Sequence, residues 1–233
     1  MQRLREYAAE YNICLTDEML AQFAEYERFL VEYNQKVNLT AITDHESILQ
    51  KHFLDSILSL NTYEIPANAS IIDVGTGAGF PGVPIKIARP DVQLTLLDSL
   101  QKRVSFLEQL SQRLNIESST VHARAEEAAH LPAHREQYDI AFSRAVAVLP
   151  VLCEYTLAYV KPGGVLLALK GRAAREEIKQ AGHAMSELGA ELEDARDYLL
   201  PDGDERSILI IRKISQTTEK YPRNAKKIAR LPL

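Results

Sequence analysis

The chain has 233 residues, of which 46% are hydrophobic, and its formal net charge is −5. These values allow one large domain with a proper core, and the acidic balance argues against a protein that coats nucleic acid through a broad excess of Lys and Arg. No apolar run reaches the length of a membrane span, and the charged start MQRLREYAAEYN differs from a signal peptide, so we expect a cytoplasmic protein without membrane contact.

The cysteine and histidine residues give no sign of a metal site. Cys14 and Cys153 lie far apart and in no C-x-x-C spacing, which argues against a structural zinc or a disulfide framework. The histidines have no carboxylate or cysteine cluster at ligand spacing. We therefore expect no bound metal.

The first 63 residues are predicted to form a helical cap. After Thr16, apolar residues recur every three or four positions, which is typical of one buried helix face: Met19, Phe23, Tyr26, Leu30 and Tyr33. A second helix is predicted from the capping-box spacing of Thr43 and Glu46. Its buried face would be Leu49, Phe53, Ile57 and Leu60.

From residue 70 the pattern changes to short apolar runs that alternate with longer amphipathic ones. Runs rich in branched residues predict strands at 70–75, 92–98, 119–125, 138–145 and 164–170. Helix-like segments lie between them at 82–90, 99–115, 149–160 and 172–188. This alternation indicates an α/β fold, with a doubly wound, mostly parallel sheet over residues 64–214.

The end of the chain departs from that alternation. Residues 189–213 contain two strand-like runs around a polar loop with Gly203, which predicts an antiparallel hairpin and brings the sheet to seven strands. Residues 215–233 form a basic tail, in which Glu219 is the one acidic side chain. The tail is open to two interpretations, a solvated flexible end or an arm that contacts phosphate.

The glycine turn after the first strand is also open to two interpretations. Read from Gly77, GAGFPG fits the dinucleotide fingerprint, with Asp98 where a ribose-binding acid is expected. However, Pro81 and Pro84 each remove a backbone donor from the helix start that would hold a pyrophosphate. The antiparallel ending also fits a paired mononucleotide fold poorly.

S-adenosylmethionine suits this turn better, because it carries no phosphate. Gly75, Gly77 and Gly79 would let the backbone approach its amino-acid end. Asp73 would help to attract its positive charge, and Asp98 would accept hydrogen bonds from the ribose hydroxyls.

At this point the sequence resembles the class I S-adenosylmethionine-dependent methyltransferases. The resemblance rests on DVGTGAGFPG at 73–82, Asp98, YDIAFSRA at 138–145 and KPGGVLLALK at 161–170. More closely, the chain is similar to the ribosomal small-subunit RNA guanine-N7 methyltransferases, also called glucose-inhibited division protein B. The stretches that carry this similarity are NLTAI, KHFLDSI, DVGTGAGFPGVPIKI, LLDSLQKRVSFLE and SRAVA.

The resemblance implies transfer of a methyl group from S-adenosylmethionine to N7 of one guanine in bacterial 16S ribosomal RNA, leaving S-adenosylhomocysteine. The partner would be the RNA within the 30S subunit or an assembly intermediate, and we expect a monomer. The family pattern implies cofactor contacts at Gly75, Phe80, Asp98, Ser99, Ala125, Glu126 and Arg144. The tail keeps Tyr-Pro-Arg and the final Pro-Leu but lacks a Gly and a Pro common between them in long members.

Guanine N7 carries a lone pair and no proton, so an in-line displacement at the sulfonium methyl needs no general base. The protein's work would be positioning and electrostatics. Arg144 and Lys170, at the ends of the fourth and fifth predicted strands, are candidates to line the cleft. His52 and Asp55, one turn apart on the second helix, could form a polar pair between cap and cleft or lie on a solvated face. His52 is the weaker catalytic candidate because N7 needs no base.

Rival functions use the same residues differently. A methyltransferase acting on a small molecule or a protein would keep the cofactor site and change the acceptor. A dinucleotide-dependent oxidoreductase would use GAGFPG and Asp98. A non-catalytic RNA-binding protein would use the cap and the basic tail alone.

Overall fold

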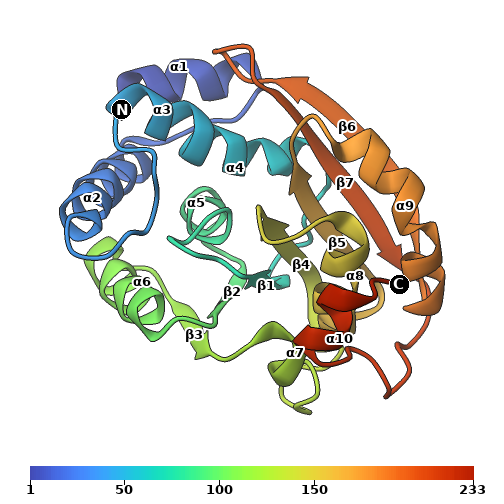
Figure 1. Ribbon diagram of the computed structural model, residues 1–233. Helices are drawn as coiled ribbons and strands as arrows, with labels where there is room; N and C mark the ends of the chain where they lie inside the picture. The colour runs from blue at the N-terminus through green and yellow to red at the C-terminus, as the bar shows by residue number, and fades with distance from the viewer.

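A computed structural model describes residues 1–233 and contains one sheet of seven strands in the order β3-β2-β1-β4-β5-β7-β6 (Figure 1). The strands are β1 Ser70–Val74, β2 Gln93–Asp98, β3 Ser118–His122, β4 Tyr138–Arg144, β5 Val160–Lys170, β6 Ala190–Leu199 and β7 Glu205–Lys213. The first five are paired in parallel, and β7 runs antiparallel to both β5 and β6. The predicted doubly wound sheet with an antiparallel C-terminal hairpin is confirmed.

Nearly continuous apolar runs form the central strands because both faces of the sheet are covered. Successive side chains point to opposite faces, so Ile71 belongs to one buried cluster and Ile72 to the other. The same division separates Ile140 from Ala141. The sheet is therefore the middle of three layers.

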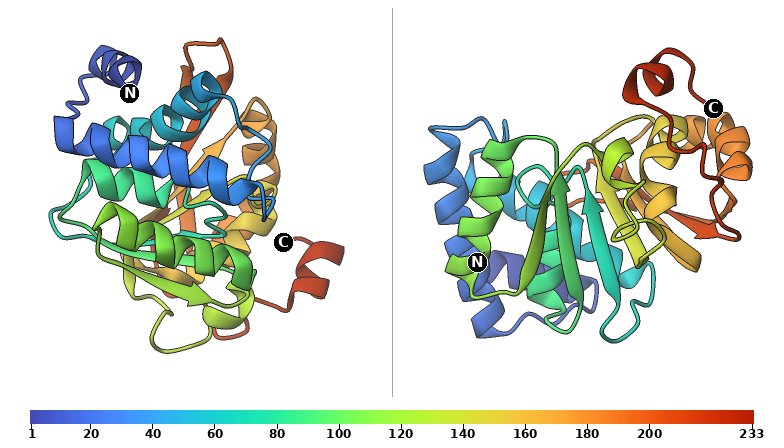
Figure 2. Two further views of the ribbon diagram at one scale, coloured as in Figure 1. Left: turned by 90° about the vertical axis from the view of Figure 1, so that its left-hand side faces the viewer. Right: turned by 90° about the horizontal axis from the view of Figure 1, so that it is seen from below.

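The helices divide between the two faces (Figure 2). Side chains of α2, α5 and α6 belong to the first cluster, and side chains of α7, α8 and α9 to the second. The longer helices are α1 Gln2–Glu10, α2 Asp17–Asn34, α5 Gly82–Ala88, α6 Gln101–Leu114, α8 Leu149–Thr156 and α9 Ala174–Glu187. Short helices are α3 His45–Ser47, α4 Asp55–Ile57, α7 Ala125–Ala128 and α10 Ala225–Arg230. None of the helices is both long and apolar enough to cross a membrane.

The N-terminal helices share a core with the sheet. The Thr16 hydroxyl accepts a hydrogen bond from the Met19 N–H and begins α2, as the sequence predicts. Of the predicted stripe, Phe23, Tyr26 and Leu30 are buried, and the two end residues are half-buried. These side chains belong to the same cluster as the strand residues of the first face.

The second cap helix begins and continues differently from the prediction. Its N-cap is Asp44, whose carboxylate accepts from the Ser47 N–H, so the capping box at Thr43 is wrong by one residue. Residues Ile48–Leu54 form a π-helix between α3 and α4. The expected strand 119–125 is also shorter than predicted, since β3 ends at His122 and Ala125 begins α7.

The basic tail is packed against the domain. Tyr221 and Ile228 are buried, and the tail ends in α10 on the side of the sheet opposite the N-terminal helices (Figure 2). Arg223 donates through Nε at 2.7 Å and Nη2 at 2.6 Å to the carboxylate of Glu154, which is fully buried. Buried Tyr221 and the Arg223–Glu154 pair thus fix the tail in place.

Candidate active site

The site lies where the strand order reverses. β1 and β4 are neighbours in the sheet, yet the chain winds outward from them in opposite directions. In open α/β sheets, ligands bind outside the carboxyl ends of the strands at such a point. Gly75 follows β1 here, and Ala145 follows β4.

The carboxylate of Asp73, the fourth residue of β1, holds the glycine turn through hydrogen bonds. Its Oδ2 accepts from the Thr76 hydroxyl at 2.7 Å and from the Gly82 N–H at 2.8 Å, which ties the two ends of the turn together. Gly82 is required there, since a Cβ would lie 2.9 Å from that oxygen. Asp73 is fully buried, its Oδ1 has no partner, and burial raises its pKa to about 6.

The cap and the loop after β4 also contact the glycine turn. The hydroxyl of buried Tyr26 in α2 donates to the Ala78 carbonyl at 2.5 Å. Gly75 has a φ of +72°, and a Cβ on it would lie 2.5 Å from Cγ2 of Val146. The glycine turn is therefore contacted both by the cap and by the loop after β4.

A cavity of about 280 Å³ opens beside this turn. Of the residues predicted to contact a cofactor, Gly75, Asp98, Ser99, Ala125 and Glu126 line it. The other predicted contacts lie outside its lining: Asp73, Gly77, Gly79, Phe80 and Arg144. The complete lining is Val74, Gly75, Leu97, Asp98, Ser99, Arg103, Ala123, Arg124, Ala125, Glu126, Ala145, Val146 and Tyr155.

Asp98 ends β2 with its carboxylate at the cavity. Its Oδ2 accepts from the Gly77 N–H at 3.0 Å, and its Oδ1 accepts from the Leu100 N–H at 2.9 Å. Arg103, in the first turn of α6, approaches Oδ2 at 3.3 Å. Gly77 has nothing within 4 Å of where a Cβ would stand, so the backbone of the turn faces open space.

Phe80 packs between the cap and the cleft. His52 stacks on its ring with a centroid distance of 4.3 Å, and Tyr26 stacks on it at 5.2 Å. The guanidinium carbon of Arg144 lies 5.0 Å from the ring centroid. Phe80 itself is only 5% exposed, which makes it a platform for these side chains.

Arg144, the last residue of β4, is held by the π-helix. The Asp55 N–H donates to the Gln50 carbonyl, one residue beyond the α-helical partner, and Arg144 Nη1 donates to the Lys51 carbonyl at 2.9 Å. Nη1 also donates to Asp55 Oδ2 at 2.9 Å. The change in helix type thus presents a backbone acceptor to the strand end.

His52 is held as a neutral ring. Arg144 Nη2 lies 3.3 Å from Nδ1, which must accept because a guanidinium has only donors. The other ring nitrogen, Nε2, then carries the hydrogen and donates to the Thr40 hydroxyl at 2.9 Å. Burial, and then the Arg144 charge, lower the His52 pKa to about 3.

Lys170 fixes the loop that follows β4. Its Nζ donates to the Ala147 carbonyl at 2.6 Å and to Glu177 Oε2 at 2.7 Å. The same carboxylate oxygen accepts from the Leu149 N–H at the start of α8. Lys170 is 9% exposed, so its ammonium is engaged within the protein.

A second cavity, of about 560 Å³, is lined by His52, Arg144 and Lys170 together with residues of the loop after β4. It shares Ala145 and Val146 with the first cavity, so two residues form a common wall. Four cations and two carboxylates line the second cavity: Lys51, Arg144, Lys170, Arg206, Asp55 and Glu177. Exposed Val146 and Val148 add an apolar surface.

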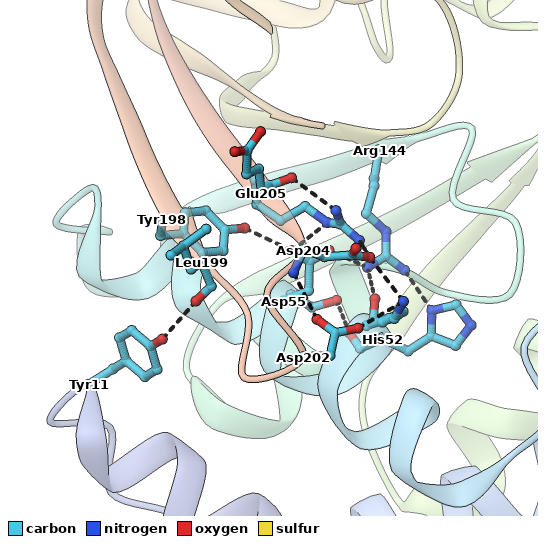
Figure 3. Close-up of polar contacts among 12 residues, drawn as sticks. Tyr11, His52, Asp55, Arg144, Tyr198, Leu199, Asp202, Asp204 and Glu205 are labelled. Atoms are coloured by element: carbon cyan, nitrogen blue, oxygen red, sulfur yellow. Dashed lines mark hydrogen bonds and ion pairs between the residues drawn. The ribbon is translucent and has the colours of Figure 1, made fainter. Parts of the chain in front are cut away.

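Several residues of the site were not identified from the sequence. The hairpin between β6 and β7 reaches the cap, where Tyr198 donates to Asp55 Oδ1 at 2.8 Å (Figure 3). Lys51 in turn pairs with Asp202 at 2.8 Å and Asp204 at 2.9 Å. The position of Arg103 at the start of the helix that follows Asp98 could have indicated it. No local pattern joins Tyr198 to Asp55, 143 positions earlier.

The chain shows a clear relationship to known proteins. Residues 19–201 match the family model described as GidB, rRNA small subunit methyltransferase G. Ribosomal RNA small subunit methyltransferase G from Acetivibrio thermocellus is 47% identical, covering 99% of this chain and 95% of that protein. The protein of the same name from Alkaliphilus metalliredigens is 46% identical, with coverage of 94% and 93%.

Solved structures with the same fold are more distant in sequence. A putative O-methyltransferase from Klebsiella pneumoniae superposes with a TM-score of 0.60 at 15% identity, covering 91% of this chain and 97% of that chain. At that identity the likeness shows the fold alone. The family model and the relatives show more: the chain belongs to the GidB family, rRNA small subunit methyltransferase G.

Proposed function

We propose that this chain transfers a methyl group from S-adenosylmethionine to N7 of one guanine in 16S ribosomal RNA. The substrate would be the RNA within the 30S subunit or an assembly intermediate, and the enzyme would act as a monomer in the cytoplasm. Membership of the GidB family supports ribosomal RNA as the substrate. The residues that line the two cavities support S-adenosylmethionine as the donor and a guanine base as the acceptor.

The cavity beside the glycine turn fits S-adenosylmethionine. Asp73 lies outside the lining, but its buried carboxylate, whose Oδ1 has no partner, would attract the positively charged ammonium of the ligand from behind the turn. Open space beside Gly77 lets the backbone approach a ligand closely. Asp98, Ser99, Ala125 and Glu126 would hold the ribose and base from the far side. When bound, S-adenosylmethionine supplies an electrophilic methyl group.

The common wall of Ala145 and Val146 is the observation that carries the proposal. A methyl donor in one cavity and an acceptor in the other would meet there and nowhere else. Methyl transfer by displacement needs the two reacting atoms close and in line. Lys170 and Glu177 fix this loop through the Ala147 carbonyl and the Leu149 N–H.

The second cavity suits a guanine within an RNA strand. Val146 and Val148 offer apolar contact to a flat base, and Arg144 lies beside them with donors that could reach its edge. The four cations of the lining are each paired with a carboxylate of the protein, so they add no free positive charge to the cavity. We propose that His52 holds Arg144 through Nδ1 and removes no proton, since N7 carries none. Arg144 would orient the base, and Lys170 would position the loop.

The dinucleotide alternative is weakened by the start of α5. The Gly82 N–H donates to Asp73, and Pro84 has no N–H, so two donors that a pyrophosphate needs are missing. A small-molecule or protein acceptor is the nearer rival, and membership of the GidB family argues against it.

The proposal is tested by incubating the enzyme with labelled S-adenosylmethionine and either 30S subunits, free 16S RNA or unrelated protein. We expect label at guanine N7 in 16S RNA, mapped by cleavage at the modified base. Arg144→Ala should lose at least about tenfold in kcat/KM, while Arg28→Ala, an exposed arginine of α2, should keep full activity. Label on protein but on no RNA would refute the proposed substrate.

A further inference from the structure

We propose that the outward face of α10, with Lys226, Lys227 and Arg230, binds backbone phosphates of the RNA beside the modified guanine. The inference rests on the proposed function and adds a second contact surface to it. It assigns a role to a segment that the two cavities of the active site leave unused.

The tail is held at a defined place. Arg135 donates to the carbonyls of Thr217 at 2.7 Å and Tyr221 at 2.9 Å, and His130 contacts the Pro222 carbonyl at 2.8 Å. Together with the buried pair of Arg223 and Glu154, these bonds hold the chain up to the start of α10. An anchored cation loses less freedom on binding phosphate than one on a flexible end.

The position of α10 is next to the cofactor cavity. A third cavity, of about 560 Å³, lies between the tail and α7, and it shares Arg124 and Glu126 with the cofactor cavity. The three cavities therefore form a row, with the cofactor cavity in the middle. RNA that places a base in the second cavity would extend along this row toward the tail.

The charges of α10 are available to a ligand. Asn224 caps the helix by accepting from the Lys227 N–H, and Ile228 turns inward into full burial. Lys226, Lys227 and Arg230 are exposed on the remaining surface, and none of them forms an ion pair. Residues 220–233 contain five cations and no acidic side chain: Lys220, Arg223, Lys226, Lys227 and Arg230.

RNA backbone is the occupant that this chemistry favours. The three exposed cations form no ion pair, so they hold no other part of the protein in place, and they stand out on a chain whose net charge is −5. Phosphates at regular spacing suit three cations on one helix face. Glu127, on the other side of the third cavity, limits this surface to the α10 side.

The test replaces Lys226, Lys227 and Arg230 by Ala together. Binding to 30S subunits is measured from 0.05 to 0.5 M KCl, with methylation of 16S RNA as a second readout. Three lost phosphate contacts should reduce the slope of log K against log salt by about 2, at about 0.7 per contact. We expect KM for 30S subunits to rise at least about tenfold, with unchanged affinity for S-adenosylmethionine.

Two control variants show whether the effect depends on the cations of α10 or only on the net charge of the protein. Arg3→Ala, Arg28→Ala and Lys179→Ala combined remove the same net charge from exposed positions elsewhere and should leave the salt slope unchanged. Lys226→Arg, Lys227→Arg and Arg230→Lys combined keep the charge and should behave as the wild type. An unchanged slope in the Ala variant would overturn the inference.

A photo-crosslinking residue in place of exposed Ala229 identifies the partner. A crosslink to 16S RNA supports the inference, and a crosslink to ribosomal protein alone overturns it. If the wild type methylates 16S RNA while the Ala variant matches it, only this inference fails. If the wild type labels no RNA, the proposed function fails as well.

Discussion

Arg144 has an acceptor for each terminal nitrogen before any substrate is bound. Nη1 donates to Asp55 and to the Lys51 carbonyl, and Nη2 to His52. Its side chain is only 15% exposed. The arginine therefore joins the cap to the end of β4 and at the same time brings positive charge to the cleft.

A first prediction concerns His52, which we expect to accept a hydrogen bond from Arg144 and not to act as a general base. His52→Asn keeps a carbonyl oxygen near Nδ1 that accepts from Arg144, so kcat should fall by less than about tenfold. Loss of a general base typically costs about 10² to 10⁴. The pH profile of kcat between pH 5.5 and 8.5 should show no histidine titration in the wild type, because the His52 pKa is about 3. A hundredfold loss with Asn, or a step near pH 6.5 that this substitution removes, would contradict the prediction.

Asp73 provides a second prediction at the scale of one residue. Asp73→Asn removes the negative charge beside the proposed cofactor site and keeps an oxygen that accepts from Thr76 and Gly82. The dissociation constant for S-adenosylmethionine, measured by calorimetry at pH 7.5, should rise about tenfold or more. Asp91→Asn, on an acid remote from the cavity, serves as the control.

The free energy of unfolding should depend on pH through the carboxyl group of Asp73. Burial raises the Asp73 pKa from 3.8 to about 6, so its contribution is most favourable below pH 3.8 and is lost as pH rises through 6. The shift corresponds to about 3 kcal/mol. Urea denaturation from pH 4 to 7.5 should show Asp73→Asn gaining stability relative to the wild type as pH rises. A constant difference across that range would be inconsistent with a raised pKa.

At the scale of elements, the glycine turn and the loop after β4 depend on one another. Gly75→Ala places a methyl group against Cγ2 of Val146 and strains a backbone with a φ of +72°. Gly163→Ala has comparable strain, with a φ of +88° and open space. We expect Gly75→Ala to lose more unfolding free energy, by about 1 to 3 kcal/mol, because only it adds a clash.

Adding Val146→Ala to Gly75→Ala tests the cause. The smaller side chain should restore part of the lost stability, and a double-mutant cycle measures the coupling. Strictly additive losses would show that the two loops do not contact as described.

The tail gives a second prediction at this scale. Glu154→Ala leaves the buried Arg223 guanidinium without its carboxylate and should cost about 3 to 5 kcal/mol of unfolding free energy, measured in urea. Glu219→Ala, on an exposed acid of the same segment, should change it by less than about 0.5 kcal/mol. Equal effects would mean that the tail is not anchored through this pair.

At the scale of the whole molecule, the cap and the sheet share one buried core, so we predict that they unfold as one cooperative unit. Phe23 and Leu49 of the cap belong to the same buried cluster as Ile71 and Leu167 of the sheet. Lys51 also pairs with Asp202 in the hairpin between β6 and β7. The Tyr11 hydroxyl donates to the carbonyl of Leu199, the last residue of β6 (Figure 3). Hydrogen exchange should therefore show the most protected amides of α2 and β4 opening with the same free energy. Earlier opening of all of α2 would show that the cap unfolds separately.

Much of this fold was predictable because its signals are local. Apolar strands buried on both faces, the glycine turn and an acid at the end of β2 are each visible within a few residues. Their order along the chain then predicts which strand ends meet. Asp98 and Arg144 were placed at the site in this way, from their positions at the ends of β2 and β4.

The rest depended on contacts between distant parts of the chain. Thr43 and Asp44 are both good caps by type, and only the surrounding packing selects Asp44. The π-helix follows from a backbone shift that no residue pattern marks. The sequence alone allows Lys170 to contact RNA or to be a solvated strand end, and the tail to be flexible or an arm that contacts phosphate. The pairs Lys170–Glu177 and Arg223–Glu154 join residues 7 and 69 positions apart, and no local pattern predicts the second.

The wall shared by the two main cavities has a thermodynamic consequence. Any ligand that displaces Val146 from its place over Gly75 changes the shape of both cavities. Occupancy of one cavity is then linked to affinity in the other, and such linkage is reciprocal. The factor by which S-adenosylmethionine alters the affinity for RNA must equal the factor by which RNA alters the affinity for S-adenosylmethionine.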